Sequence, residues 1–179
     1  MFTFRLNNIR KQNILKQKMQ LTGKEIAAKG IVYNYDSVKG IQQQGIDVRV
    51  DSIYQLLGTG IVNRCSSQIP SRKQIQPTDE GLYVLEPGYY EVDLMEGVEV
   101  PNNATLHFKT RSSLVRCGAQ VYSSQFDAGF YTEKMGCFLH VIRPISIEKY
   151  ARIAQAIVFE SSSVENTYDG QFQNDKQRK

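Results

Sequence analysis

Short runs of alternating hydrophobic and polar residues dominate the sequence, and turn residues separate these runs. Such alternation has the period of a half-buried strand, so we predict a strand at each run. The predicted strands are Ile46–Val50, Tyr83–Leu85, Tyr89–Leu94, Thr105–Lys109, Ala119–Tyr122, Cys137–Ile142 and Ala156–Phe159. Many short strands with one early helix predict an all-β domain built as a barrel or a sandwich.

The early helix is predicted from a capping box, in which the Thr22 side chain bonds a free amide and Glu25 reaches back to the threonine backbone. We expect this helix to cover residues 23–29 and to end at Gly30. Residues 58–80 are polar and have no regular period, so we expect them to form a long surface loop.

The chain is predicted to hold one domain with two loosely packed ends. Its 179 residues are enough for one core but too few for two. We expect a basic extension at residues 1–18, a β domain at residues 19–160 and a flexible tail at residues 161–179. The extension could also be an organelle transit peptide, although it lacks the serine enrichment of such signals. No apolar run approaches the roughly 20 residues that span a bilayer, so membrane insertion is not expected.

Charge and cysteine content exclude two further classes of protein. The formal charge of +4 comes from the chain ends, because residues 19–175 hold 14 of the 22 basic residues and all 18 acidic ones. A nucleic-acid-binding surface is therefore not expected. Three cysteines without CxxC spacing indicate reduced thiols in a cytoplasmic protein, and neither a disulfide framework nor a zinc knuckle. We expect His107 and His140, which lie in strand-like runs, to be structural.

Four segments carry groups suited to chemistry, and they need a joint explanation. Two contain an acid beside a glycine, one combines arginines with serines after a strand, and one holds an arginine and a glutamine three residues apart. These segments are Gly45–Arg49, Phe126–Phe130, Arg111–Arg116 and Ala151–Gln155.

The segment after the strand predicts a polyphosphate site. A turn or helix that begins at Ser112 would direct backbone amides and the hydroxyls of Ser112 and Ser113 toward one place. The guanidiniums of Arg111 and Arg116 flank the same segment. Amides allow a phosphate to approach closely, and guanidiniums bind it through two parallel hydrogen bonds.

In their order along the chain and at their spacing, the four segments resemble the conserved motifs of the trimeric dUTPase and dCTP deaminase superfamily. Leu85–Val92, Glu99–Pro101 and Thr110–Arg116 are similar to the deaminase branch in particular. The resemblance covers about residues 19–173. It implies a distorted β-barrel of the dUTPase-like (β-clip) type, a homotrimer with sites between subunits, and deoxyuridine or deoxycytidine triphosphate as the substrate.

The resemblance also implies roles for individual residues. Asp127 matches the acid that orients and deprotonates water in the dUTPase branch, and Ser112 and Arg116 are expected to act in catalysis beside it. Arg111 and Ser113 match the phosphate-binding motif.

Further positions match residues that bind the substrate or a metal ion. Gln155 matches a contact to the phosphate chain, and Phe130 falls where the family places an aromatic ring beneath deoxyribose. Asp47 matches an acid that holds Mg²⁺ through water, which suits an ion that keeps its waters and binds substrate phosphates.

The chain end resembles the deaminase tail and lacks the glycine-rich arm of the dUTPase branch. Tyr168 offers an aromatic cap, and Gln173 is expected to bind the substrate. With Gln171, Lys176 and Arg178, this tail could fold over the phosphates and exclude water.

One requirement separates the two branches. Deamination without zinc needs a glutamate about ten residues after the turn aspartate, but counting from Asp127 reaches Gly136 and Cys137. Glu133 lies four residues from that position, and a zinc-deaminase signature is missing. We therefore predict that the protein hydrolyses dUTP with Mg²⁺. The alternatives are a dCTP deaminase that uses Glu133 and a protein that binds the nucleotide without catalysis.

Overall fold

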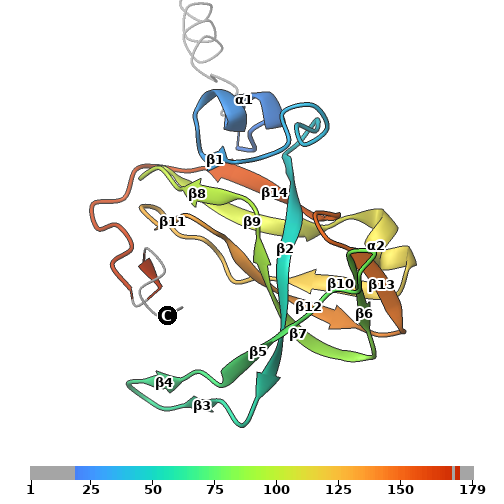
Figure 1. Cartoon of the computed structure of the whole chain (residues 1–179). Helices are drawn as coiled ribbons and strands as arrows, with labels where there is room; N and C mark the ends of the chain where they lie inside the picture. Colours follow the sequence, from blue (N-terminus) through green and yellow to red (C-terminus); the bar gives the residue numbers. More distant parts are fainter. Residues whose placement is uncertain (1–18, 171, 174–179) are drawn as a thin grey trace, which may run out of the picture.

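A computed structural model describes residues 19–170, 172 and 173 of the chain (Figure 1). The largest sheet has seven antiparallel strands. They are β2 (Ile46–Leu57), β5 (Ser71–Ile75), β7 (Gly88–Leu94), β9 (Ala104–Thr110), β10 (Ala119–Tyr122), β12 (Gly136–Val141) and β14 (Arg152–Glu160). Six of them follow the order β10-β12-β7-β2-β14-β9, and β5 pairs with β2. The prediction of a mainly β domain with one early helix is confirmed.

Three smaller sheets complete the domain. The first joins β1 (Val32–Tyr33), β8 (Gly97–Glu99) and β11 (Tyr131–Thr132), the second joins β6 (Leu82–Leu85) and β13 (Ile145–Glu148), and the third joins β3 (Ile61–Val62) and β4 (Ser67–Gln68). Among the described residues, no helix has the length and apolar character to cross a membrane.

The edges of the main sheet approach each other and give a nearly closed barrel. Thr110 at the end of β9 exchanges hydrogen bonds with the backbone of Val121 in β10, at 3.0 and 3.2 Å. Nearer the start of β9, Leu106 forms a backbone bridge with Phe126. The segment after β10 therefore runs beside β9 and seals the gap between the two edge strands.

The predicted capping box is present at the helix α1 (Gly23–Ala28). Thr22 accepts a hydrogen bond from the Glu25 amide, and the Glu25 carboxylate accepts one from the Thr22 amide at 2.8 Å. The chain leaves the helix through Gly30, whose φ of 66° suits a residue without a side chain. Ile26, which is fully buried, fixes the helix to one end of the barrel.

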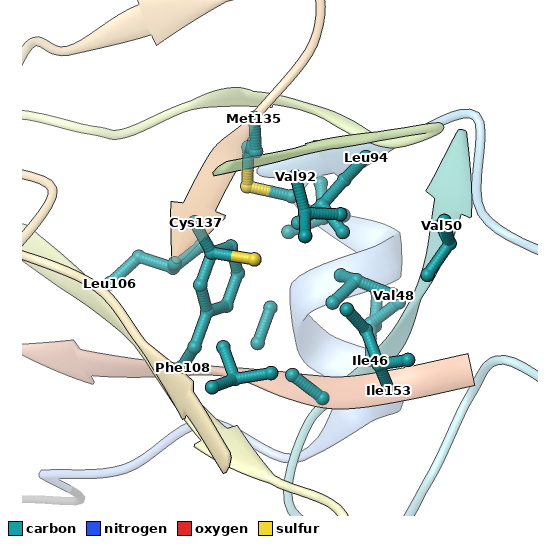
Figure 2. Close-up of a cluster of buried hydrophobic side chains, with 14 of the residues drawn as sticks. Ile46, Val48, Val50, Val92, Leu94, Leu106, Phe108, Met135, Cys137 and Ile153 are labelled. Carbon is teal, nitrogen blue, oxygen red and sulfur yellow. The ribbon is translucent and has the colours of Figure 1, made fainter. Parts of the chain in front are cut away.

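Side chains from several strands meet inside the barrel (Figure 2). Val48, Val92, Leu106 and Ile153 come from four different strands, and each is at most 1% exposed. Burial of one such side chain contributes about 1.5–3 kcal/mol of stability. This core fixes the strands whose ends carry the candidate site.

The predicted surface loop at residues 58–80 is wrong. It contains β3, β4 and β5, and β5 pairs with a β2 that continues to Leu57, well beyond the predicted end at Val50. Figure 1 shows this arm extending away from the barrel. Both of its faces meet solvent along much of its length, so its strands lack the alternation that sequence patterns detect.

Candidate active site

Asp47 lies at the centre of the first group of predicted site residues. Its side chain is 2% exposed on β2. Its Oδ2 accepts a hydrogen bond from Arg152 Nη1 at 3.1 Å and forms an ion pair with Arg111 Nε at 3.2 Å. Gln155 Nε2 donates to its Oδ1 at 3.4 Å. A buried carboxylate is stable only when it is paired and hydrogen-bonded. These contacts meet that requirement for Asp47, and they also fix the positions of the two arginines and the glutamine.

A β-bulge in β14 explains how two side chains three residues apart reach one carboxylate. In a regular strand, residues at this spacing face opposite sides. The pairing of β14 with β2 shifts between Arg152 and Ala154, so that Ile153 and Ala154 are both buried and Gln155 lies opposite Asp47. The strand predicted at Ala156–Phe159 therefore begins earlier, at Arg152, and the bulge puts the arginine and the glutamine on one face.

These side chains border a polar cavity of about 230 Å³. Its lining residues are Gln42, Asp47, Lys109, Thr110, Arg111, Ser112 and Gln155. Two cations, Lys109 and Arg111, face the single carboxylate of Asp47, which Arg152 also neutralises. A cavity with this excess of positive charge suits an anion with several oxygens, such as a polyphosphate.

Sequence reasoning missed three of these lining residues: Gln42, Lys109 and Thr110. Lys109 on β9 lies directly opposite Gln155 on β14. Cross-strand neighbours share a face, but this signal appears only when the pairing of the two strands is known.

The helix α2 (Ser112–Arg116) begins at the residue predicted for it. The first amides of any helix have no acceptor in a preceding turn, and those of α2 lie next to the cavity that Ser112 lines. Ser113 and Arg116 are exposed and are not among the lining residues. Their predicted contacts to a nucleotide stay predictions.

A second buried ion pair stabilises the strand that carries Asp47. Arg49 Nε donates to Glu96 Oε1 at 2.7 Å, and Arg49 Nη2 donates to the carbonyl of Asn34 at 2.5 Å. Glu96 is fully buried, and this burial raises the pKa of its carboxyl above the usual range, against the opposing effect of Arg49. The ion pair thus ties β2 to the turn between β7 and β8, and the bond to Asn34 ties it to the loop after β1.

Asp127 belongs to a second group of residues, at the turn between β10 and β11. It is exposed, and its Oδ1 accepts a hydrogen bond from Gln125 Nε2 at 2.6 Å. The turn is closed by Gly129 with a φ of 82° and by a bond from the Phe130 amide to the Asp127 carbonyl. Asp127 also lines a second cavity of about 340 Å³, together with Thr105 and residues of the tail.

The predicted aromatic and tail residues lie in this second group. The ring of Phe130 is in edge contact with Phe126 and Tyr168, at centroid distances of 5.4 and 5.3 Å. The Gln173 amide bonds the backbone of the same turn. That Tyr168 and Gln173 touch a nucleotide stays a prediction. Three other tail residues considered above lie outside the described residues: Gln171, Lys176 and Arg178.

The two groups lie at opposite ends of β9. Thr105 near the start of the strand lines the cavity with Asp127, whereas Thr110 at its end lines the cavity with Arg111. Five residues of antiparallel strand span about 17 Å. Within one chain, the carboxylate of Asp127 therefore does not reach a phosphate bound beside Arg111.

The position where a deaminase glutamate is expected carries no acid. Cys137 lies in β12 with its side chain 3% exposed, directed into the core. Glu133 is exposed in the turn between β11 and β12, next to Lys134, whose ammonium binds Asp51 at 2.7 Å. The four-residue offset between Glu133 and Cys137 therefore separates a solvent-facing turn from a core position.

A magnesium ion fits the first cavity only as the companion of a bound polyphosphate. Asp47 is its single carboxylate, and both carboxylate oxygens already accept hydrogen bonds. Residues 19–170, 172 and 173 contain no cluster of three His, Cys, Asp or Glu residues that could hold a metal ion. Mg²⁺ commonly binds through one carboxylate, several waters and substrate phosphates, which this cavity allows.

Comparison with known proteins agrees with this geometry. Residues 14–162 match the dCTP deaminase-like family. The chain is 35% identical over 133 residues to the deoxyuridine 5′-triphosphate nucleotidohydrolase of Methanocaldococcus jannaschii, covering 73% of this chain and 85% of that protein. It is 32% identical over 141 residues to a probable enzyme of the same name from Halobacterium salinarum, covering 76% and 84%.

A solved structure has the same fold. The 2′-deoxycytidine 5′-triphosphate deaminase of Agrobacterium tumefaciens superposes with a TM-score of 0.60 at 17% identity, over 81% of this chain. The present chain spans about half of the length of that deaminase chain, 49%.

The family match and the relatives place the chain in the dUTPase and dCTP deaminase superfamily, as the sequence motifs predicted, and the nearly closed barrel agrees with this. The chain belongs to the dCTP deaminase-like family.

Proposed function

We propose that the protein is a dUTP diphosphatase that hydrolyses dUTP to dUMP and pyrophosphate. Its relatives at 30–35% identity are named for this activity. In this reaction Asp127 takes a proton from a water molecule whose oxygen attacks the α-phosphorus. The bond from the α-phosphorus to the bridging oxygen breaks, and pyrophosphate leaves with that oxygen. Arg111, Ser112 and Gln155 bind the phosphate chain. Arg116, at the end of α2, supplies a further positive charge that offsets the negative charge of the phosphates.

The missing second carboxylate is the observation that carries this proposal. Deamination needs a proton-shuttling acid at the base. The family resemblance implies that the segment between Arg116 and Asp127 reads the base, and residues 117–126 contain no Asp or Glu. The position about ten residues after Asp127, where a deaminase has its glutamate, is occupied by Cys137, which is buried in the core. Hydrolysis at the α-phosphorus needs only one base, and Asp127 is exposed and oriented by Gln125.

We further propose that the active site is assembled between subunits of a homotrimer. The separation of Asp127 from Arg111 along β9 supports this, because the two groups could act on one nucleotide only if different copies supplied them. Closed rings of identical subunits are a common form of oligomer. Phe130 would then pack beneath the deoxyribose beside Asp127.

Mg²⁺ is the proposed cofactor, with Asp47 as its contact through water. When bound with the nucleotide, the ion would neutralise phosphate charge that the protein cations leave uncompensated. The proposed location is the cytoplasm, where the exposed thiols of Cys65 and Cys117 would stay reduced.

A single assay tests the proposed reaction. The purified protein with Mg²⁺ is given dUTP and dCTP separately, and both pyrophosphate and ammonia are measured. We expect pyrophosphate from dUTP and no ammonia from dCTP, because no acid lies at the base. Ammonia release would support the deaminase alternative with Glu133. Tight binding of a non-hydrolysable dUTP analogue without any product would indicate a nucleotide-binding protein that is not an enzyme.

A further inference from the structure

The described part of the tail follows a defined path along its own subunit. The backbone amides of Ser161 and Val164 bond the carbonyls of Asn103 and Asn102, at 2.8 and 3.0 Å. The chain then passes beside the end of β11 (Figure 1). Backbone contacts thus lead the tail from the end of β14 to the turn that carries Asp127.

The side-chain amide of Gln173 bonds that turn at two points. Its Nε2 donates to the Gly129 carbonyl at 2.9 Å, and its Oε1 accepts from the Tyr131 amide at 3.1 Å. Both halves of one amide are therefore used on backbone groups that flank Phe130. A third bond joins the Tyr168 amide to the Ala128 carbonyl at 2.8 Å.

The turn is shaped to receive the tail. A side chain at Gly129 would place its Cβ 2.4 Å from Thr167 Cβ, and the φ of 82° at Gly129 also disfavours any side chain. On the other side of the turn, the Phe130 ring lies between Phe126 and Tyr168. Glycine at this position therefore permits both the turn and the close approach of the tail.

The residues on both sides of Asp127 are held by hydrogen bonds to other parts of the chain. The Phe126 backbone is bonded to Leu106, the Ala128 carbonyl to Tyr168, and the Gly129 carbonyl to Gln173. The carboxylate itself is oriented by Gln125. If the tail contacts were lost, the turn would keep its backbone bonds to Leu106 and to Val100 and its internal hydrogen bond, but the Ala128 and Gly129 carbonyls would lose their partners.

We propose that Gln173 is a positioning residue, whose amide fastens the tail to the Asp127 turn of the same subunit and so holds the catalytic acid in place. This inference rests on the proposed function, in which Asp127 activates water. It gives Gln173 a role that differs from the substrate contact implied by the family resemblance.

The test compares Gln173→Ala and Gln173→Glu with Glu165→Ala, a control at an exposed tail residue. We expect Gln173→Ala to lower kcat for dUTP about tenfold, as the loss of two hydrogen bonds suggests, with KM changed less than about twofold. The control should keep both constants. A rise in KM at unchanged kcat would make Gln173 a substrate contact, and a rise in kcat would make the docked tail inhibitory. Either result overturns the proposal.

Gln173→Glu adds a readout that a purely structural contact would not change. The carboxylate can still accept from Tyr131 but cannot donate to Gly129, and it brings negative charge to the Asp127 turn. Because a nearby negative charge disfavours an anionic base, we expect the acid limb of the kcat profile to move to higher pH. An unshifted limb would contradict the proposal.

Hydrogen exchange separates this inference from the proposed reaction, because it needs no catalysis. In Gln173→Ala, the Tyr131 amide should exchange faster than in the wild-type protein, while the Leu106 amide in β9 should not change. A protein that failed to hydrolyse dUTP but showed this pattern would contradict the reaction and retain the tail contact. Unchanged exchange at Tyr131 would overturn the contact itself.

Discussion

Asp127→Asn is expected to abolish dUTP hydrolysis while nucleotide binding persists. Asparagine keeps the shape of the side chain and can still meet Gln125, but it cannot accept a proton from water. Loss of a general base lowers rates by about 10²–10⁴. The affinity for a non-hydrolysable dUTP analogue should stay within about threefold, since in the proposed reaction Asp127 acts on water and the cations that bind the phosphate chain are unchanged. Pyrophosphate release and calorimetric binding measure the two quantities.

Asp79→Asn is the matched control for this experiment. Asp79 is an exposed aspartate in the turn before β6, outside both cavities. Its substitution removes the same charge from the molecule, so full activity is expected. If Asp127→Asn kept the activity of this control, Asp127 would not be the base.

Asp47→Asn is expected to cost both stability and activity. Its carboxylate is the buried partner of Arg111 and Arg152, and removal of its charge leaves two guanidiniums facing each other. Breaking a fully buried pair costs 3–5 kcal/mol, and the partial exposure of both arginines reduces our expectation to about 2–4 kcal/mol in the free energy of unfolding. Urea denaturation measures this loss.

Asp51→Asn provides the comparison on the same strand. Asp51 pairs with Lys134, whose side chain is 53% exposed, so the loss of its charge should cost about 1 kcal/mol or less. Its hydrolysis of dUTP should also be retained. Equal stability of Asp47→Asn and Asp51→Asn would show that Asp47 does not organise the arginines.

Local signals in the sequence predicted much of the fold. The capping box at Thr22 depends on neighbours three residues apart, and the strands of the barrel alternate because one face meets the core. The arm at residues 58–80 was missed because two exposed faces give no alternation. The strands β1, β8 and β11 were missed as well, since two or three residues are too few to establish a period, and β13 was also missed.

The candidate site was predicted unevenly for a related reason. The phosphate motif at Arg111 and Ser112 is contiguous, so the helix start could be predicted from sequence alone. That Arg152 and Gln155 share a face depends on a bulge, and that Lys109 joins them depends on register. Both are properties of strand pairing.

Complementation between two inactive variants tests most directly whether Asp127 and the phosphate cavity act on one nucleotide from different subunits. One variant is Asp127→Asn, and the other is Arg111→Gln, which leaves Arg152 on Asp47. Each is expected to be inactive alone. Random mixing in a trimer should restore about a quarter of the wild-type sites, because one neighbour supplies the intact cavity and the next supplies the intact aspartate. Mixed trimers with no more activity than the separate variants would contradict a shared site.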